Sequence, residues 1–231
     1  MPDRGAVRPE PVITIDGPAG AGKSTVARQL ARRLGYRYLE TGAMYRAMAW
    51  KVARVGVLPG APGEFERVVR STRIEITQSG RLMTDGLDIT ETIRSPEVDQ
   101  LASRLSALPV VREVLTRLQR EAVKDGGVVL EGRDTGSVVA PDAEVKFYLD
   151  ASLEERARRR LRDLVLRGRA AEIGRVTREL AERDQADTSR ALAPLVKPRD
   201  AHYVDSSALS PDEVVELMLQ EVRRARCSTK S

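Results

Sequence analysis

A chain of 231 residues can build one hydrophobic core with insertions, and it stays below the roughly 250 to 300 residues at which single cores stop growing. Its residues are 41% hydrophobic and 32% charged, and no stretch approaches the roughly 18 apolar residues of a membrane span, so we expect a globular protein without a membrane partner. One cysteine and one histidine exclude an internal disulfide and a Cys/His metal cluster, so any metal must be held by oxygen.

The net charge of +5 comes from basic residues spread along the chain rather than gathered in one arm, so we expect no nucleic-acid partner. Only six of the 39 basic residues are lysine, and the bias toward arginine fits a protein that handles phosphate, since a guanidinium group binds phosphate through paired hydrogen bonds. Genome composition or heat adaptation would produce the same bias. Residues 1–11 carry charge and proline but no apolar run, so they do not resemble a signal peptide, and we expect a cytoplasmic protein.

The first predicted element is a β-branched strand at 12–16, which runs into a glycine-rich turn and then a helical pattern at 26–34. Apolar runs at 128–130 and 145–149 predict two more strands, each followed by turn residues and a helical segment, and 203–204 is a weaker strand candidate. Strands that alternate with helices predict an α/β fold, in which a parallel sheet is covered on both faces and ligands bind at the carboxyl ends of the strands.

Two stretches break this alternation. Residues 73–88 alternate apolar and polar side chains around the turn signals Ser79-Gly80 and Asp85-Gly86, which predicts a small antiparallel flap inserted into the fold. Residues 153–180 are dense in arginine and helix formers and are interrupted at Gly168 and Gly174. They predict two helices joined by a mobile segment, either a lid or a solvated pair of surface helices.

The strongest motif follows the first strand. Residues 17–24 match the pattern Gly-x-x-x-x-Gly-Lys-Ser of the phosphate-binding P-loop without a mismatch, between a predicted strand and a predicted helix. The glycines let backbone N–H groups point at phosphate oxygens, Lys23 bridges the terminal phosphates, and the Ser24 hydroxyl is a ligand for Mg²⁺. We therefore expect ATP and Mg²⁺ as cofactors. The expected ATP-binding residues of this segment are Gly17, Pro18, Ala19, Gly20, Ala21, Gly22, Lys23, Ser24 and Thr25.

Other features narrow the class of P-loop protein. A GTPase usually reads guanine with an Asn-Lys-x-Asp motif, and this sequence contains no asparagine. A motor or transport ATPase should carry a hydrophobic strand that ends in Asp-Glu, and none is found. A kinase remains. Asp16, at the end of the first strand, has two readings that both stay open, an outer partner of Mg²⁺ or a turn residue.

Four segments in order resemble the bacterial cytidylate kinases. They are 12–24, 41–46 (Thr-Gly-Ala-Met-Tyr-Arg), 131–134 (Glu-Gly-Arg-Asp) and 183–195. The later motifs are weak one by one, but their order and spacing are specific, and the flap at 73–88 looks like the insertion that enlarges the monophosphate-binding region of this family. Thr41 and Glu131 stand where some members have Ser and Asp, and both changes preserve the functional group.

This resemblance implies the P-loop nucleoside-monophosphate-kinase fold, with a five-stranded parallel sheet between helices, a monophosphate-binding insertion with a small antiparallel flap, and a helical lid. It implies one kinase domain over residues 1–231. The implied core covers about 11–40, 106–152 and 190–226, the insertion about 41–105, and the lid about 153–189. The resemblance also implies a monomer.

The activity that the resemblance implies is transfer of the γ-phosphoryl group of Mg·ATP to CMP or dCMP, which gives CDP or dCDP and ADP. Arg156 is expected at the adenine, and the implied catalytic residues are Lys23, Arg133, Arg160 and Arg183. The implied substrate-binding residues are Thr41, Tyr45, Arg46, Ser103, Arg112, Arg133, Asp134, Arg183, Asp187 and Arg190. Two rival readings are a P-loop kinase of another small metabolite, such as shikimate or a sugar acid, and a non-catalytic nucleotide-sensing module.

Within this set, Arg46 and Arg133 would hold the CMP phosphate. Cytosine would be read by Ser103, Arg112 and Asp134, because its edge offers one amine donor and acceptor atoms. Arg183, Asp187 and Arg190 are spaced four and three apart, so they would share one helix face toward the sugar and phosphate or form an ion-pair ladder. The neighbours Arg158, Arg159 and Arg162 leave the choice of Arg156 and Arg160 open.

Overall fold

The computed structural model describes residues 10–57, 59–60, 62–77, 80–166 and 168–228. The chain forms two compact units, of which the first comprises Met1–Leu39 with Val123–Ser231 and the second Glu40–Ala122. Each unit has a sheet of its own, five-stranded in the first and three-stranded in the second. Within the described ranges, no helix combines the length and the apolar character that a bilayer crossing requires.

The sheet of the first unit has the strand order β2-β6-β1-β7-β8. Its strands are β1 (Val12–Asp16), β2 (Arg37–Glu40), β6 (Val128–Gly132), β7 (Val145–Asp150) and β8 (His202–Asp205). β1 pairs in parallel with β6 and β7, β8 pairs in parallel with β7, and every residue of β1 and β6 is buried. The predicted parallel sheet of five strands is confirmed. Because the strands run the same way, Asp16, Gly132 and Asp150 end them at one edge.

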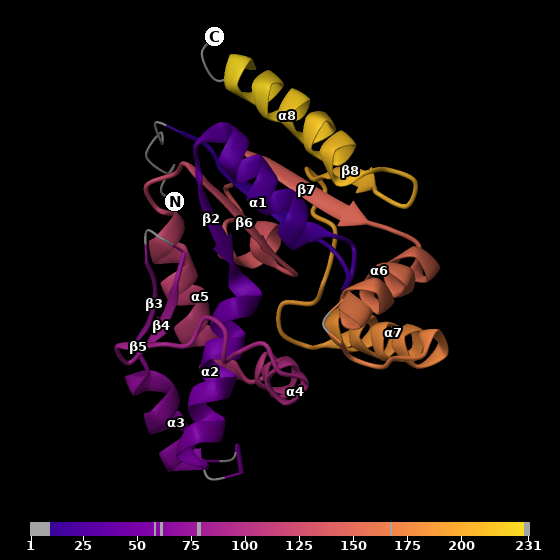
Figure 1. Ribbon diagram of the computed structural model, residues 1–231. Coiled ribbons are helices and arrows are strands. Elements are labelled where there is room, and N and C mark those ends of the chain that lie inside the picture. Colours follow the sequence, from indigo (N-terminus) through magenta and orange to yellow (C-terminus); the bar gives the residue numbers. More distant parts are fainter. Residues whose placement is uncertain (1–9, 58, 61, 78–79, 167, 229–231) are drawn as a thin grey trace. The chain divides into compact units, whose positions relative to one another are not determined.

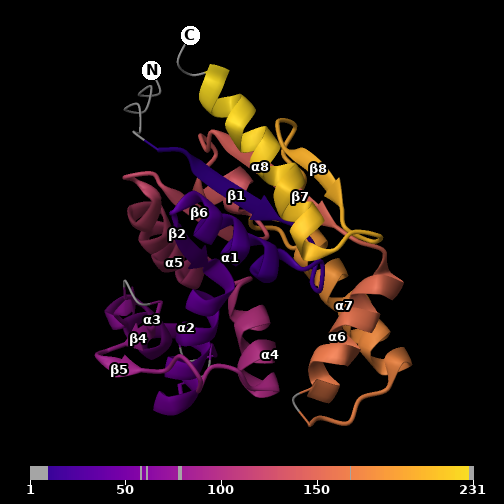
Figure 2. The same ribbon diagram turned by 45° about the horizontal axis from the view of Figure 1, so that its top comes forward.

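Two helices cover this sheet together. α1 (Lys23–Leu34) and α8 (Pro211–Ser228) lie beside each other in Figures 1 and 2 and share one core cluster with the strands. Leu30, Phe147 and Met218 are among its most buried members. The apolar spacing that predicted α1 places Val26 and Leu30 inward, and the helix ends at Gly35 in a left-handed conformation.

The segment expected to form a lid is a pair of helices, α6 (Leu153–Leu166) and α7 (Ile173–Ser189), which pack side by side. Gly168 lies between them, as predicted, whereas Gly174 belongs to the first turn of α7. The pair has a small core of its own, in which Ala157, Val176 and Leu180 pack around Ala19 of the glycine-rich turn.

The second unit contains the predicted antiparallel flap, β3 (Ile74–Ile76), β4 (Leu82–Thr84) and β5 (Leu87–Asp88). Asp85 and Gly86 form its second turn with φ of 49° and 80°. In the first turn, Gly80 has φ of 79°, and Ser79 lies outside the described residues. The helices are α2 (Thr41–Val55), α3 (Pro62–Ser71), α4 (Pro96–Leu105) and α5 (Pro109–Val123). α2 contacts α3, α4 and the flap.

Candidate active site

The loop between β1 and α1 has the backbone that a phosphate cradle needs. Gly17, Gly20 and Gly22 have φ of 150°, 80° and 95°, which side-chain-bearing residues rarely adopt. A Cβ atom at Gly17 would lie 1.9 Å from the carbonyl oxygen of Leu149, so only glycine lets the loop leave β1 this close to β7. Gly22 caps α1 without a side-chain hydrogen bond, which leaves first-turn N–H groups for an anion. The predicted strand, loop and helix are confirmed.

Lys23 begins α1 and is 5% exposed. Its Nζ donates a hydrogen bond to the carbonyl of Pro18 at 2.7 Å. Burial and the nearby guanidinium of Arg133 lower the pKa of Lys23 to about 7, although Glu131 acts in the opposite direction. The positive charge of the Lys23 ammonium group is therefore poorly balanced by the protein alone, and an anionic ligand would balance it.

Two oxygen-bearing side chains meet beside the P-loop. Ser24 lies at the start of α1, and Glu131 lies near the end of β6. The Ser24 hydroxyl donates to Oε1 of Glu131 at 2.8 Å, and Glu131 is buried. A hydroxyl and a carboxylate are hard oxygen ligands, so this pair fits Mg²⁺. Sequence reasoning noted Glu131 only within the resemblance. The signal that would have found it is a carboxylate near the end of a buried strand adjacent to the P-loop strand.

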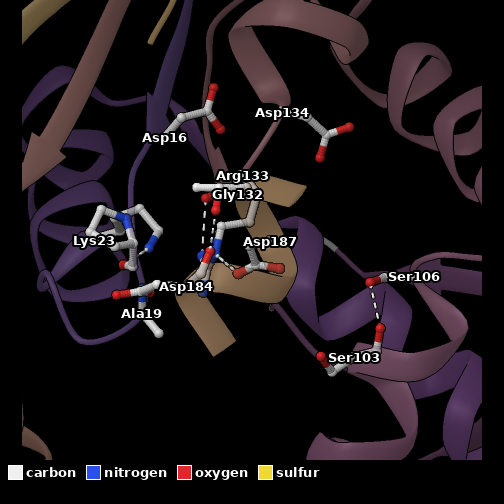
Figure 3. A network of polar contacts seen from close by, with 12 residues as sticks. Asp16, Ala19, Lys23, Ser103, Ser106, Gly132, Arg133, Asp134, Asp184 and Asp187 are labelled. Atoms are coloured by element: carbon white, nitrogen blue, oxygen red, sulfur yellow. Dashed lines mark hydrogen bonds and ion pairs between the residues drawn. The ribbon is translucent and has the colours of Figure 1, made fainter. Parts of the chain in front are cut away.

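A second cluster joins the end of β6 to the end of α7. Nε of Arg133 donates to Asp187 at 2.7 Å, and its Nη1 donates to the carbonyl of Gly132 at 3.1 Å (Figure 3). Nη2 of Arg190 donates to Asp134 at 3.3 Å, and its Nη1 lies 3.8 Å from Asp187. The structure therefore brings together four of the predicted substrate residues.

The charges of this cluster favour an ionised Asp187. Burial raises the pKa of Asp187, but Arg133, Arg183 and Arg190 together lower it below its usual range. Arg190 follows the last residue of α7 and has extended backbone, so the three residues expected on one helix face divide between the helix and its C-cap. The ion pair between Arg190 and Asp187 shows that the ladder reading also describes part of this geometry.

Five of the other predicted substrate residues belong to the second unit. Arg112 is buried, its guanidinium lies 5.9 Å from the centre of the Tyr45 ring, and its Nη1 donates to the carbonyl of Ser106 at 3.1 Å. Arg46 pairs with Glu40 and lies 3.9 Å from Asp99. Thr41 is buried at the start of α2, one turn before Tyr45 and Arg46. Ser103 lies on α4, and its carbonyl accepts a hydrogen bond from the hydroxyl of Ser106.

Comparison with known proteins places this geometry in a family. The model of the cytidylate kinase family matches residues 13–224. A cytidylate kinase of Pelotomaculum thermopropionicum is 48% identical over 94% of this chain and 97% of its own length. A cytidylate kinase of Desulfitobacterium hafniense is 46% identical over 90% of both chains. This chain belongs to the cytidylate kinase family.

A comparison of folds adds a more distant likeness. A crystal structure of an uncharacterized protein from Eubacterium ventriosum has a TM-score of 0.51 and 10% identity to this chain. The alignment covers 93% of this chain and 99% of the other. At that identity, the match shows a shared fold alone.

The arginines of α6 and α7 in this member of the cytidylate kinase family have different surroundings. Arg156 is buried, and it donates from Nε to the carbonyl of Ala151 at 2.9 Å and from Nη1 to the carbonyl of Ala19 at 3.0 Å. Within the described part of the chain, half-buried Arg160 makes no hydrogen bond or ion pair. Arg183 is exposed, and its charge contributes to lowering the pKa of Lys23.

Arg159 also contacts the P-loop, although sequence reasoning did not select it. It donates from Nη1 to the carbonyl of Ala21 at 3.3 Å and from Nη2 to the carbonyl of Ser206 at 2.6 Å. It therefore joins the P-loop to the turn after β8. No signal distinguishes it within a run of three arginines, 158–160.

Both carboxylate oxygens of Asp16 accept hydrogen bonds from a distant segment of the chain. Its Oδ1 accepts hydrogen bonds from the N–H and hydroxyl of Thr135, and its Oδ2 accepts one from the N–H of Gly136, at 2.7 to 2.9 Å. Burial raises its pKa above the usual range despite these hydrogen bonds. The three hydrogen bonds to Asp16 hold the start of a short π-helix, η1 (Thr135–Val139), which directly follows Arg133 and Asp134.

Proposed function

We propose that this protein transfers the γ-phosphoryl group of ATP to CMP or dCMP and releases ADP and CDP or dCDP. The observation that carries the proposal is an intact P-loop in a chain that aligns with a cytidylate kinase over 94% of its length. The arginine and carboxylate cluster beside that loop supports the proposal, because an anionic acceptor needs such a clamp.

The chemistry requires positioning rather than a general base. The acceptor is a phosphate oxygen that is already ionised, so catalysis consists of bringing two anions into line and neutralising the developing charge. In this proposal Lys23 bridges the terminal phosphates of ATP, and Arg160 and Arg183 meet the transferring group. Arg46 and Arg133 hold the phosphate of CMP.

Ser24 and Glu131 would hold Mg²⁺, directly or through water. When bound, the ion would neutralise negative charge on the phosphates of ATP. The P-loop N–H groups and Lys23 face the same phosphates, so these residues share one task, which is to reduce repulsion between donor and acceptor.

We assign the cytosine edge to Asp134, Arg112 and Ser103, because a carboxylate, a guanidinium and a hydroxyl complement its amine and its acceptor atoms. The sugar and phosphate contacts fall to the remaining predicted residues, Thr41, Tyr45, Asp187 and Arg190. Residues 41–105 would form the monophosphate-binding insertion, and 153–189 would act as a lid that excludes water as a rival acceptor. The family resemblance also implies a cytoplasmic monomer.

A coupled ADP-release assay tests the proposal. With Mg·ATP and a panel of CMP, dCMP, UMP, AMP, GMP and shikimate, we expect strong turnover with CMP and dCMP. Lys23→Ala should lower kcat by about a hundredfold or more, because it removes a charge that acts on the transferring phosphates. Lys197→Ala, which changes an exposed lysine, is the matched control and should retain the wild-type rate.

The panel also separates the rival functions. Turnover with shikimate alone would support phosphoryl transfer at the P-loop but would contradict the assignment of CMP as the acceptor. Binding of ATP without turnover of any panel member would favour a nucleotide-sensing module. Equal rates with CMP and AMP would contradict the assigned cytosine contacts.

A further inference from the structure

Two successive peptide units of the P-loop, on either side of the Cα atom of Ala19, are held by side chains of α6 and α7. The N–H of Ala19 donates to Oδ1 of Asp184 on α7 at 3.2 Å, and its carbonyl accepts from Nη1 of Arg156 on α6 at 3.0 Å. The same Nη1 pairs with Oδ2 of Asp184. Ala19, Arg156 and Asp184 therefore form a closed ring of contacts, and Figure 3 shows Asp184 beside Ala19.

Packing supports the same contact independently of the polar groups. Ala19 is 5% exposed and shares a small apolar core with Ala157, Val176 and Leu180 of the two helices. A Cβ atom at Gly20 would lie 3.1 Å from the Cβ of Arg156, so the loop runs close against α6. The surface of the helix pair therefore shapes this stretch of the loop.

This ring answers a physical requirement of the P-loop. Its glycines can adopt many conformations, and a phosphate cradle works only if its N–H groups already point inward. The Pro18–Ala19 peptide cannot rotate without breaking the bond that the Ala19 N–H donates, and the Ala19–Gly20 peptide cannot rotate without breaking the bond that the Ala19 carbonyl accepts. Side chains of Arg156 and Asp184 are only 8% and 20% exposed, so their charge-assisted hydrogen bonds are partly shielded from water.

We propose that Asp184 is a positioning residue for phosphoryl transfer, one that fixes the P-loop through Ala19 and Arg156 without touching either nucleotide. The proposal rests on the proposed function. Asp184 directly follows Arg183 on α7, and Arg156 lies one turn before Arg160 on α6, so the ring also sets where both predicted catalytic arginines lie relative to the loop.

Asp184→Ala removes both contacts, and Asp184→Asn keeps an acceptor for the Ala19 N–H while it removes the charge beside Arg156. We expect Asp184→Ala to raise KM for ATP by about ten- to a hundredfold and to lower kcat by about tenfold, with KM for CMP within about twofold of wild type. Asp184→Asn should lie between these values. Glu182→Gln, an exposed acid on the same helix, is the control and should match wild type.

Calorimetry of Mg·ADP binding provides a readout that does not depend on turnover, so it tests Asp184 even if CMP is not the acceptor. We expect Kd to rise by about ten- to a hundredfold in Asp184→Ala. In a cycle with Arg156→Ala, the double variant should lose little more than the worse single variant, because both act through one ring.

Three results would overturn the proposal. One is wild-type Kd for Mg·ADP in Asp184→Ala or Asp184→Asn. Another is an equal rise in KM for ATP and CMP, which would indicate a general structural defect. The third is full additivity with Arg156→Ala. If Asp184→Ala fails to fold, Asp184→Asn alone carries the comparison with Glu182→Gln.

Discussion

Gly17 leaves β1 with φ of 150° directly against the carbonyl of Leu149. That carbonyl belongs to a strand that is paired on both sides, so it cannot give way easily. We expect Gly17→Ala to lower the free energy of unfolding by about 3 kcal/mol or more and to abolish Mg·ADP binding. Denaturant unfolding and calorimetry measure the two effects.

Gly35→Ala is the matched control for that prediction. Gly35 also has a positive φ, 72°, but nothing lies within 4 Å of the Cβ atom it would gain. Its cost should be only the backbone strain of about 1 kcal/mol, with unchanged nucleotide binding. Equal destabilisation by the two substitutions would show that strain, rather than the collision with Leu149, decides the requirement for glycine.

Lys23 predicts a pH effect on nucleotide binding. Burial and Arg133 lower its pKa to about 7 in the free site, so above that pH the amine loses its proton. A bound polyphosphate favours the ammonium form and raises the pKa again. Binding of Mg·ADP at about pH 8.5 should therefore take up a proton, and Kd should rise as the pH increases from 7 to 9.

Calorimetry in buffers of different ionisation enthalpy measures that proton uptake. Lys23→Met, which retains much of the side-chain volume, should abolish it. A wild-type protein that binds Mg·ADP at this pH without uptake would show that Lys23 is already protonated in the free site.

At the scale of elements, β1 and η1 are joined through Asp16. Its carboxylate accepts the N–H groups of Thr135 and Gly136, immediately after Arg133 and Asp134. Asp16→Asn replaces one acceptor oxygen with an amide donor, so the start of η1 loses a bond. We expect KM for CMP to rise about tenfold and KM for ATP to change less.

Thr135→Val should give a smaller effect of the same kind. It removes only the hydroxyl contact with Asp16, so it should raise KM for CMP by less than Asp16→Asn does. Steady-state kinetics with each nucleotide varied in turn measures both values. A larger change in KM for ATP than in KM for CMP would place the influence of Asp16 on the adjacent P-loop instead.

The elements with a local signal were predictable. β1, α1, the flap and the helix pair each show apolar periodicity and glycine punctuation within a few residues. β2 was not predicted, because Arg37–Glu40 carries charge at both ends and has only one buried residue. η1 was not predicted either, since Thr135–Val139 contains three β-branched residues and a glycine, features that disfavour a helix.

The site residues also differ in whether a local sequence signal predicts them. The P-loop follows from a contiguous motif, whereas the substrate residues came from resemblance, and their roles stay predictions. Asp184 and Ala19 are 165 positions apart, so no local pattern could pair them. Arg156, Arg159 and Arg160 are chemically identical, and only the fold distinguishes which of them contacts the P-loop.

At the scale of the whole molecule, the protein has a net charge of +5, which is opposite in sign to the negative charge of both nucleotides. Electrostatic attraction should raise the rate of their association, and salt should screen it. Between about 50 and about 300 mM KCl we expect KM for ATP and for CMP to rise severalfold while kcat changes little. A series with sucrose in place of salt controls for solution viscosity. A fall in kcat at constant KM would contradict this expectation.

The apolar core of α6 and α7 has a consequence for the order of folding. One of its four buried residues, Ala19, comes from the P-loop, so the helix pair cannot complete its core until β1 and that loop have formed. Segments with so few buried contacts open most readily in the native state. Backbone amides of α6 and α7 should thus exchange with solvent deuterium earlier than those of α1 and α8. A nucleotide that rigidifies the loop should slow this exchange. Nucleotide binding at the P-loop would then be measurable as slower amide exchange in α6 and α7, which lie far along the chain from the loop.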